Sequence, residues 1–125
     1  MIHLDTHVVV WLYAGLREKL SERAGALIEQ EDLRASPMVH LELQYLHEIG
    51  RLSVPGTAVL ADLGRRIGLG LAGTPMDAAV ASALPLGWTR DPFDRLIAGC
   101  ALAEGVPLLT ADRRMLDHLA VAVWD

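Results

Sequence analysis

The chain has 125 residues, of which 52% are hydrophobic and 22% are charged. We expect a single domain over residues 1–125, because this length supports one core. The longest apolar runs, such as residues 8–12, are too short to span a membrane. The first residues also lack the basic stretch and long apolar segment of a signal peptide, and the single cysteine, Cys100, cannot form an internal disulfide. These features predict a soluble cytoplasmic protein and exclude a membrane-spanning one.

The net charge at neutral pH is −5. Proteins that bind nucleic acids constitutively gain most of their affinity by neutralising phosphates with basic side chains. The acidic balance therefore argues against that class, and it also weighs against an RNA substrate.

Strands and helices are expected to alternate along the chain. The predicted elements are, in order, a strand at 2–5, helices at 7–14 and 22–30, a weak strand at 32–36, a helix from 37 to about 50, a helix at 57–67, a strand at 69–72, helices at 74–84 and 92–104, a strand at 106–110, a helix at 112–119 and a strand at 121–124. Ser36-Pro37 and Asp91-Pro92 each combine an N-cap residue with proline at the first helical position. The alternation predicts an α/β sandwich around a parallel sheet.

Two acidic residues lie at the carboxyl ends of predicted strands. Asp5 ends the first strand, and Asp112 lies two residues after the strand at 106–110. Ligands of parallel sheets collect outside the carboxyl ends of the strands, so we expect these two acids to be neighbours. Each also has an ordinary interpretation as the N-cap of the following helix. Thr6 and Thr110 supply hydroxyls beside them.

Glu42 lies inside a predicted helix. It is four residues from Met38 and from Leu46, so the three side chains share one face. We interpret this face as an apolar stripe that continues through Tyr45 and Ile49. A carboxylate buried there without a partner is costly or becomes protonated, so the pattern favours Glu42 pointing into a polar site.

Asp91 and Asp94 lie on either side of the start of the helix at 92–104. Asp91 fits the N-cap, and Asp94 lies in the first turn, where the helix dipole stabilises a negative charge. Because Asp91 already has a structural role, Asp94 is the better candidate for a metal ligand.

If the fold gathers these acids, their mutual repulsion requires a cation. Ligand sets made only of oxygen select hard ions such as Mg²⁺ or Mn²⁺, whereas zinc is not indicated because the chain has no CxxC pair and no HExxH motif. Such ions activate water and stabilise the leaving oxygen of a phosphodiester. Candidate donors to a substrate phosphate are Thr6, Thr110, Arg90, Arg95 and Arg113.

The segments LDTHVVVWL, RDPFDRLIAG and LLTADRRM, with a Glu inside an early helix, resemble the PIN-domain ribonucleases. They are most similar to the VapC-type toxins of bacterial type II toxin–antitoxin modules. The match is collinear over nearly the whole chain, and RDPFDRLIA followed by LLTAD is its most specific part. Residues 50–85 carry no motif of the family.

This resemblance implies a three-layer α/β/α sandwich and an endoribonuclease that depends on Mg²⁺ or Mn²⁺. By position, the family's metal-binding acids correspond to Asp5, Glu42, Asp94 and Asp112, with Asp91 as an accessory acid. Thr110 corresponds to a hydroxyl near the reacting water. A homodimer and a small antitoxin are also implied, and an acidic groove that receives a basic antitoxin segment agrees with the net charge.

The residues present argue against two other classes of protein. A phosphoacceptor receiver domain needs an acidic pair after the first strand and a lysine after the last, but Asp5 is followed by Thr6 and the only lysine is Lys19. A PIN-like module that only binds or dimerises is the remaining alternative. The full set of acids argues against it.

Overall fold

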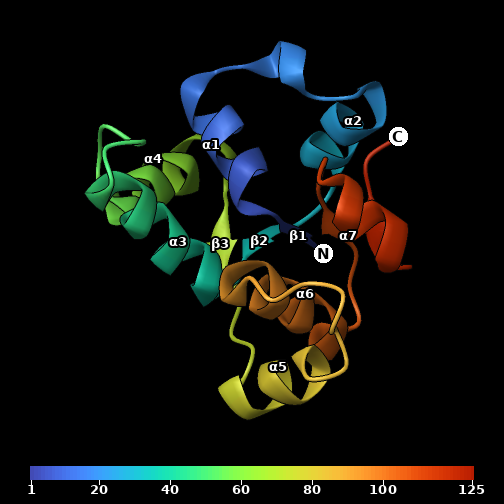
Figure 1. Cartoon of the computed structure of the whole chain (residues 1–125). Coiled ribbons are helices and arrows are strands. Elements are labelled where there is room, and N and C mark those ends of the chain that lie inside the picture. Colours follow the sequence, from blue (N-terminus) through green and yellow to red (C-terminus); the bar gives the residue numbers. More distant parts are fainter.

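The computed structural model describes all residues from 1 to 125 (Figure 1). Five parallel strands form one sheet in the order β3-β2-β1-β4-β5. The strands are β1 Ile2–Leu4, β2 Leu33–Ala35, β3 Gly70–Leu71, β4 Leu108–Leu109 and β5 Ala122–Val123. The helices are α1 Thr6–Ala14, α2 Glu22–Gln30, α3 Pro37–Glu48, α4 Gly56–Ile67, α5 Met76–Ala83, α6 Pro92–Glu104 and α7 Arg113–His118, with a short 3-10 helix, η1, at Arg17–Lys19.

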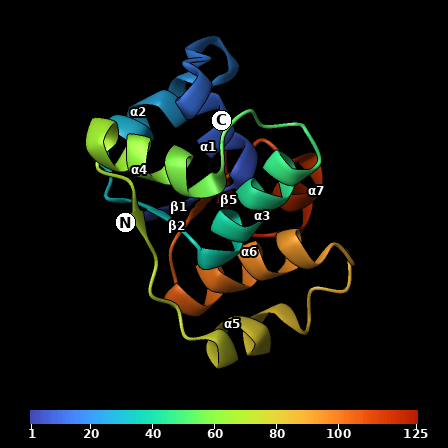
Figure 2. The same ribbon diagram turned by 90° about the vertical axis from the view of Figure 1, so that its left-hand side faces the viewer.

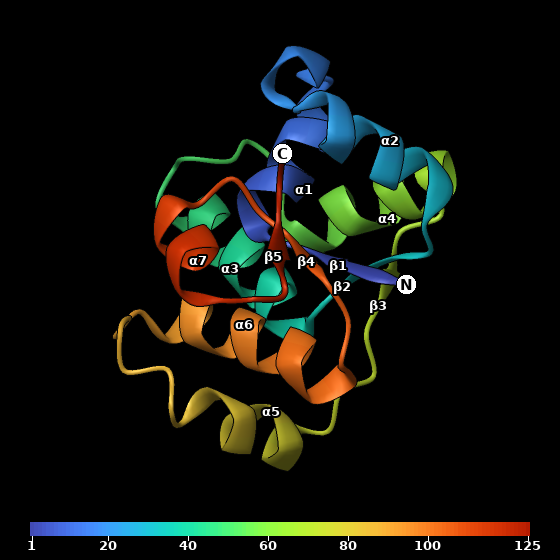
Figure 3. The same ribbon diagram turned by 90° about the vertical axis from the view of Figure 1, so that its right-hand side faces the viewer.

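Helices cover both faces of the sheet. Helix α3 lies between α4 and α6 (Figure 2) and contacts both of them as well as α1. Figure 3 shows α1, α2 and α4 on one face, with α6 on the opposite face and α5 packed outside α6. The predicted α/β/α sandwich with a central parallel sheet is therefore confirmed.

The central strands are buried on both sides. Ile2 and Leu4 of β1 and Leu108 and Leu109 of β4 have no exposed surface, because helices pack on each face of a parallel sheet. β1 pairs directly with β4, with Leu4 opposite Leu109. The residues that follow these two strands therefore emerge side by side.

The observed elements follow the predicted order, with shorter strands. Helix α7 begins at Arg113, since Asp112 serves as its N-cap. Helix α5 begins at Met76, and Thr74 does not cap it but donates a hydrogen bond to Glu104. The sequence did not predict η1.

Helix α3 corrects the interpretation of Glu42. Its fully buried side chains are Val39 and Leu43, so the row that contains Glu42 lies at the margin of the core. Tyr45 and Ile49 are 46% and 49% exposed. The expectation that they continue a buried apolar stripe was wrong, because the helix packs through the adjacent face.

Candidate metal centre

All four predicted acids line one pocket. Its volume is about 290 Å³, and its walls are formed by Asp5, Thr6, His7, Val10, Glu42, Leu46, Arg51, Asp94 and Asp112. The acids come from the end of β1, the middle of α3, the first turn of α6 and the start of α7. Acids that are far apart in sequence therefore meet at the carboxyl ends of the neighbouring strands β1 and β4.

Asp5 is the most firmly held acid. Its backbone N–H donates to Leu109 O at 3.0 Å, which continues the pairing of β1 with β4. Its Oδ1 accepts a bond from Thr6 N at 2.8 Å, and its Oδ2 accepts one from Thr110 Oγ1 at 2.7 Å. The buried carboxylate is thus both the N-cap of α1 and part of the pocket wall.

Asp112 also has both roles. Its Oδ1 accepts bonds from Arg114 N at 2.8 Å and Met115 N at 3.3 Å, which caps α7. Its own N–H donates to Thr110 Oγ1 at 3.0 Å. Because that hydroxyl also donates to Asp5, Thr110 links the two acids that follow β1 and β4.

Glu42 reaches the pocket from α3. Thr6 Oγ1 donates to Glu42 Oε1 at 2.5 Å. Burial raises the pKa of Glu42, the Thr6 hydrogen bond opposes this, and the charges of Asp5 and Asp91 add to the rise. The carboxylate is therefore held in place, although neighbouring acids disfavour its charge.

Asp91 caps α6, as the sequence predicts, and Asp94 lies in the first turn of the same helix. Asp91 Oδ1 accepts bonds from Phe93 N and Asp94 N at the start of α6, whereas the Asp94 side chain lines the pocket. Burial, followed by the charges of Asp5, Asp91, Glu42 and Asp112, raises the pKa of Asp94 to about 7. No hydrogen bond contributes to this shift, so Asp94 carries the least compensated charge in the pocket.

His7 lines the pocket as a structural residue. Its Nε2 accepts a bond from Ala111 N at 2.9 Å, and its Nδ1 lies 3.6 Å from Asp5 Oδ2. A neutral imidazole has one donor and one acceptor nitrogen, so the ring proton sits on Nδ1 and faces Asp5. His7 thereby ties α1 to the segment between β4 and α7.

The predicted substrate donors differ in their placement. The Thr6 and Thr110 hydroxyls already donate to Glu42 and Asp5, so they position acids. The guanidinium of Arg95 donates to the carbonyls of Ala83 and Leu84 at 3.0 and 2.8 Å. It thereby provides hydrogen bonds to backbone carbonyls at the C-terminal end of α5. This placement gives no support to a substrate role for Arg95, because two of its N–H donors hold these carbonyls and its side chain does not line the pocket.

Arg90 and Arg113 are exposed and do not line the pocket. The arginine that does line it is Arg51, which the sequence interpretation missed. The sequence signal that could have indicated Arg51 is Gly50. This glycine marks the end of α3, so the next residue lies where the chain leaves the helix beside the pocket.

The donors fit a hard divalent cation. Four carboxylates face one pocket, and the raised pKa values of Glu42 and Asp94 show how unfavourable their charges are without a counterion. Carboxylate oxygens are the ligands that Mg²⁺ and Mn²⁺ prefer. No three of these side chains lie close enough together to ligate a single ion, so binding requires side-chain rotation.

Residues 2–121 match the family model of the PIN domain. The chain belongs to the PIN-domain family. This PIN domain is 37% identical over 130 residues to Ribonuclease VapC22 of Mycobacterium tuberculosis, and the match covers 97% of this chain and 96% of that protein. Its fold resembles the crystal structure of VapBC2 from Rickettsia felis bound to a DNA fragment from their promoter, with a TM-score of 0.71, 21% identity and full coverage of both chains. None of its helices combines the length and apolar character that a membrane span requires.

Proposed function

We propose that this PIN domain is a divalent-metal-dependent endoribonuclease and the toxin of a toxin–antitoxin pair in the cytoplasm. The observation that carries the proposal is the pocket in which Asp5, Glu42, Asp94 and Asp112 converge. The identity to a protein named as a ribonuclease supports RNA as the substrate.

In this proposal the four acids hold the cation, and Asp91 contributes negative charge from the start of α6. A bound Mg²⁺ or Mn²⁺ supplies activation of water and neutralisation of charge on the phosphodiester. Thr110 and Thr6 keep Asp5 and Glu42 directed toward the pocket through the hydrogen bonds described above. Asp94 has no such support, so its orientation depends most on the ion.

A small basic antitoxin is the partner that fits the pocket. The net charge of −5 and the concentration of carboxylates at one edge of the sheet favour a cationic segment there. A positively charged side chain in the pocket would offset the same repulsion as the metal ion.

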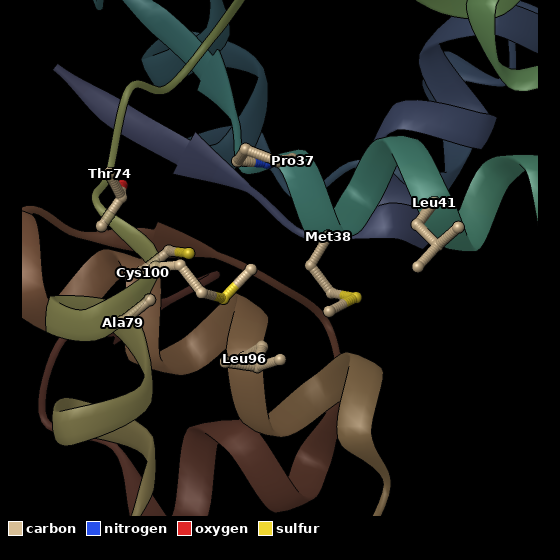
Figure 4. A pocket seen from close by; sticks show the side chains of 8 residues that line it. Pro37, Met38, Leu41, Thr74, Ala79, Leu96 and Cys100 are labelled. Atoms are coloured by element: carbon tan, nitrogen blue, oxygen red, sulfur yellow. The ribbon is translucent and has the colours of Figure 1, made fainter.

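A homodimer is the assembly that we propose. Leu41 of α3 and Met76 and Leu84 of α5 are 56%, 63% and 68% exposed. An apolar pocket of about 250 Å³ lies between these helices and α6, and Figure 4 shows Met38 and Leu41 directed toward it from α3. Exposed apolar side chains around an apolar pocket are typical of protein interfaces.

The catalytic proposal is tested with a fluorescent single-stranded RNA. We expect cleavage in Mg²⁺ or Mn²⁺ and none in EDTA. In the Asp94→Asn variant the cleavage rate should fall at least about a hundredfold, because a neutral amide replaces a charged metal-binding carboxylate. Asp117→Asn is the matched control, since Asp117 is an exposed acid of α7 outside the pocket. Cleavage that persists in EDTA or in Asp94→Asn would contradict the proposal.

The alternative of a module that only binds or dimerises accounts poorly for Asp94. Asp5, Asp91 and Asp112 have capping roles, which a structural module also needs. The Asp94 carboxylate makes no such contribution and its charge is disfavoured. An acid that costs stability is explained by a site that uses it.

A further inference from the structure

We propose that Arg51 binds a phosphate of the RNA backbone at the acidic pocket and positions the strand that is cut. This inference rests on the proposed ribonuclease activity and adds a residue that the acid motif does not contain. It concerns the segment between α3 and α4, where the sequence shows no family motif.

Arg51 is the only arginine or lysine that lines the pocket. The ion pairs of the structure use Arg17, Arg34 and Arg66, and the guanidinium groups of Arg95 and Arg114 donate to backbone carbonyls. Arg51 takes part in none of these interactions and is exposed. Its donors are therefore free beside the carboxylates.

The backbone holds Arg51 in place. Helix α3 ends in a left-handed turn at Gly50, whose φ is +81°. Gly50 N donates to His47 O at 3.1 Å, and Arg51 N donates to Leu46 O at 2.8 Å, which is the Schellman arrangement of a helix end. Because Leu46 also lines the pocket, this turn carries Arg51 to the pocket wall.

The residue after Arg51 is anchored as well. Leu52 is buried, and its carbonyl accepts a bond from His47 Nδ1 at 2.9 Å. The chain is thus tied to α3 on both sides of Arg51. An arginine on a fixed backbone loses less conformational freedom on binding than one on a mobile loop.

The chemistry of the pocket requires a positive group for the substrate. A guanidinium matches phosphate oxygens with two parallel hydrogen bonds, and contacts to phosphates set the register of a nucleic acid on a protein. The carboxylates repel a polyanion approaching the pocket, and a cationic side chain in its wall offsets that repulsion. Arg51 is placed to bind the RNA strand, and the acids are placed to bind the metal ion.

The competing role for Arg51 is that of a counterion for the acids. In that role its removal would change the affinity for Mg²⁺ and leave the affinity for RNA unaltered. In the proposed role its removal weakens RNA binding, and the Mg²⁺ concentration at half-maximal activity stays the same or falls. Steady-state kinetics at varied RNA and varied Mg²⁺ separate the two roles.

The test compares Arg51→Ala, Arg51→Lys and Arg65→Ala in the full chain, with a short single-stranded RNA. Arg65 is the matched control, because it is an exposed arginine of α4 outside the pocket and its loss changes the net charge equally. We expect Arg51→Ala to raise KM roughly tenfold, as the loss of a charge-assisted contact implies. Arg51→Lys should recover part of this loss, and Arg65→Ala should match the wild type.

A KM for Arg51→Ala within twofold of that for Arg65→Ala would overturn the inference, and so would an effect confined to the Mg²⁺ dependence. Both outcomes leave the proposed ribonuclease activity standing. Absence of metal-dependent cleavage by the wild-type protein would instead remove the proposed function, and this inference with it.

Discussion

Single residues of the pocket differ in how their charge is supported. Asp5 accepts hydrogen bonds from Thr6 N and Thr110 Oγ1, and Glu42 accepts one from Thr6 Oγ1. Asp94 has only burial and repulsion acting on its pKa. The sequence pattern favours Glu42 as the acid without a structural role, whereas the structure assigns that position to Asp94.

The metal-free protein is therefore expected to lose stability as the pH rises. The folded pKa of Asp94, about 7, lies above its unfolded value, so the folded state retains a proton that the unfolded state has released. The free energy of unfolding should fall between about pH 4 and pH 7. In Asp94→Asn this component of the decline disappears, and at pH 8 the variant should be more stable by about 1 kcal/mol, a figure reduced for partial exposure to solvent.

Urea denaturation in EDTA at pH 5 and pH 8 measures this effect. Asp117→Asn is the control, because Asp117 is exposed and outside the pocket. The same pH dependence in the wild type and in Asp94→Asn would show that Asp94 is not strained by its neighbours.

Thr110 is expected to act through the two acids that it links. Its hydroxyl donates to Asp5 and accepts from Asp112 N, so Thr110→Val removes a link between two of the acids proposed to bind the metal. We expect metal affinity and RNA cleavage to fall about tenfold, as is usual when a partner that orients a metal ligand is lost. Thr110→Ser keeps the hydroxyl and should retain most of the activity, and equal losses in both variants would refute the positioning role.

At the scale of elements, local signals in the sequence predict much of the architecture. Ser36-Pro37 and Asp91-Pro92 mark the starts of α3 and α6, and both prolines occupy the first turn. The alternation of strands and helices predicts the parallel sheet, and the expected closeness of Asp5 and Asp112 follows from the pairing of β1 with β4 in that sheet. These features depend on residues close together in sequence or on a general rule of parallel sheets.

The sequence could not predict features set by tertiary packing. The choice of Val39 and Leu43 as the buried face of α3 depends on where α4 and α6 lie, and several apolar faces of α3 satisfy the same periodicity. The position of Arg51 depends on the direction in which the chain leaves the Gly50 turn. The use of Arg95 at the end of α5 depends on the packing of α5 against α6.

That packing requires Gly99. A Cβ at Gly99 would lie 2.5 Å from Ala79 O and 2.9 Å from Ala83 Cβ, so Gly99→Ala forces α5 away from α6. We expect a loss of about 1–3 kcal/mol in the free energy of unfolding, measured by chemical denaturation. Gly25→Ala in α2 is the matched control, because a Cβ there meets no atom within 4 Å. It should be neutral or stabilising, and equal effects of the two substitutions would contradict the proposed close contact.

At the scale of the whole molecule, the acidic pocket and the apolar surface of α3 and α5 are separate features. The pocket is lined by carboxylates, whereas the surface beside α5 exposes Leu41 and Met76. We therefore expect catalysis and dimerisation to be separable by mutation.

The homodimer is tested by light scattering coupled to gel filtration. The wild type should show about twice the chain mass of 13.6 kDa, and Leu41→Glu or Met76→Glu should reduce it to the mass of one chain, because a charge is buried at the interface. Leu71→Glu is the control, since Leu71 is exposed on β3. A monomeric wild type, or a dimer unaffected by both substitutions, would contradict this assembly.

The proposed activity requires that the four acids bind a divalent cation. Calorimetric titration of Mn²⁺ at pH 8, where Asp94 is ionised, tests it most directly. We expect saturable binding by the wild type and by Asp117→Asn, with at least about tenfold weaker binding by Asp94→Asn. Equal affinity in all three proteins, or no binding by the wild type, would contradict it.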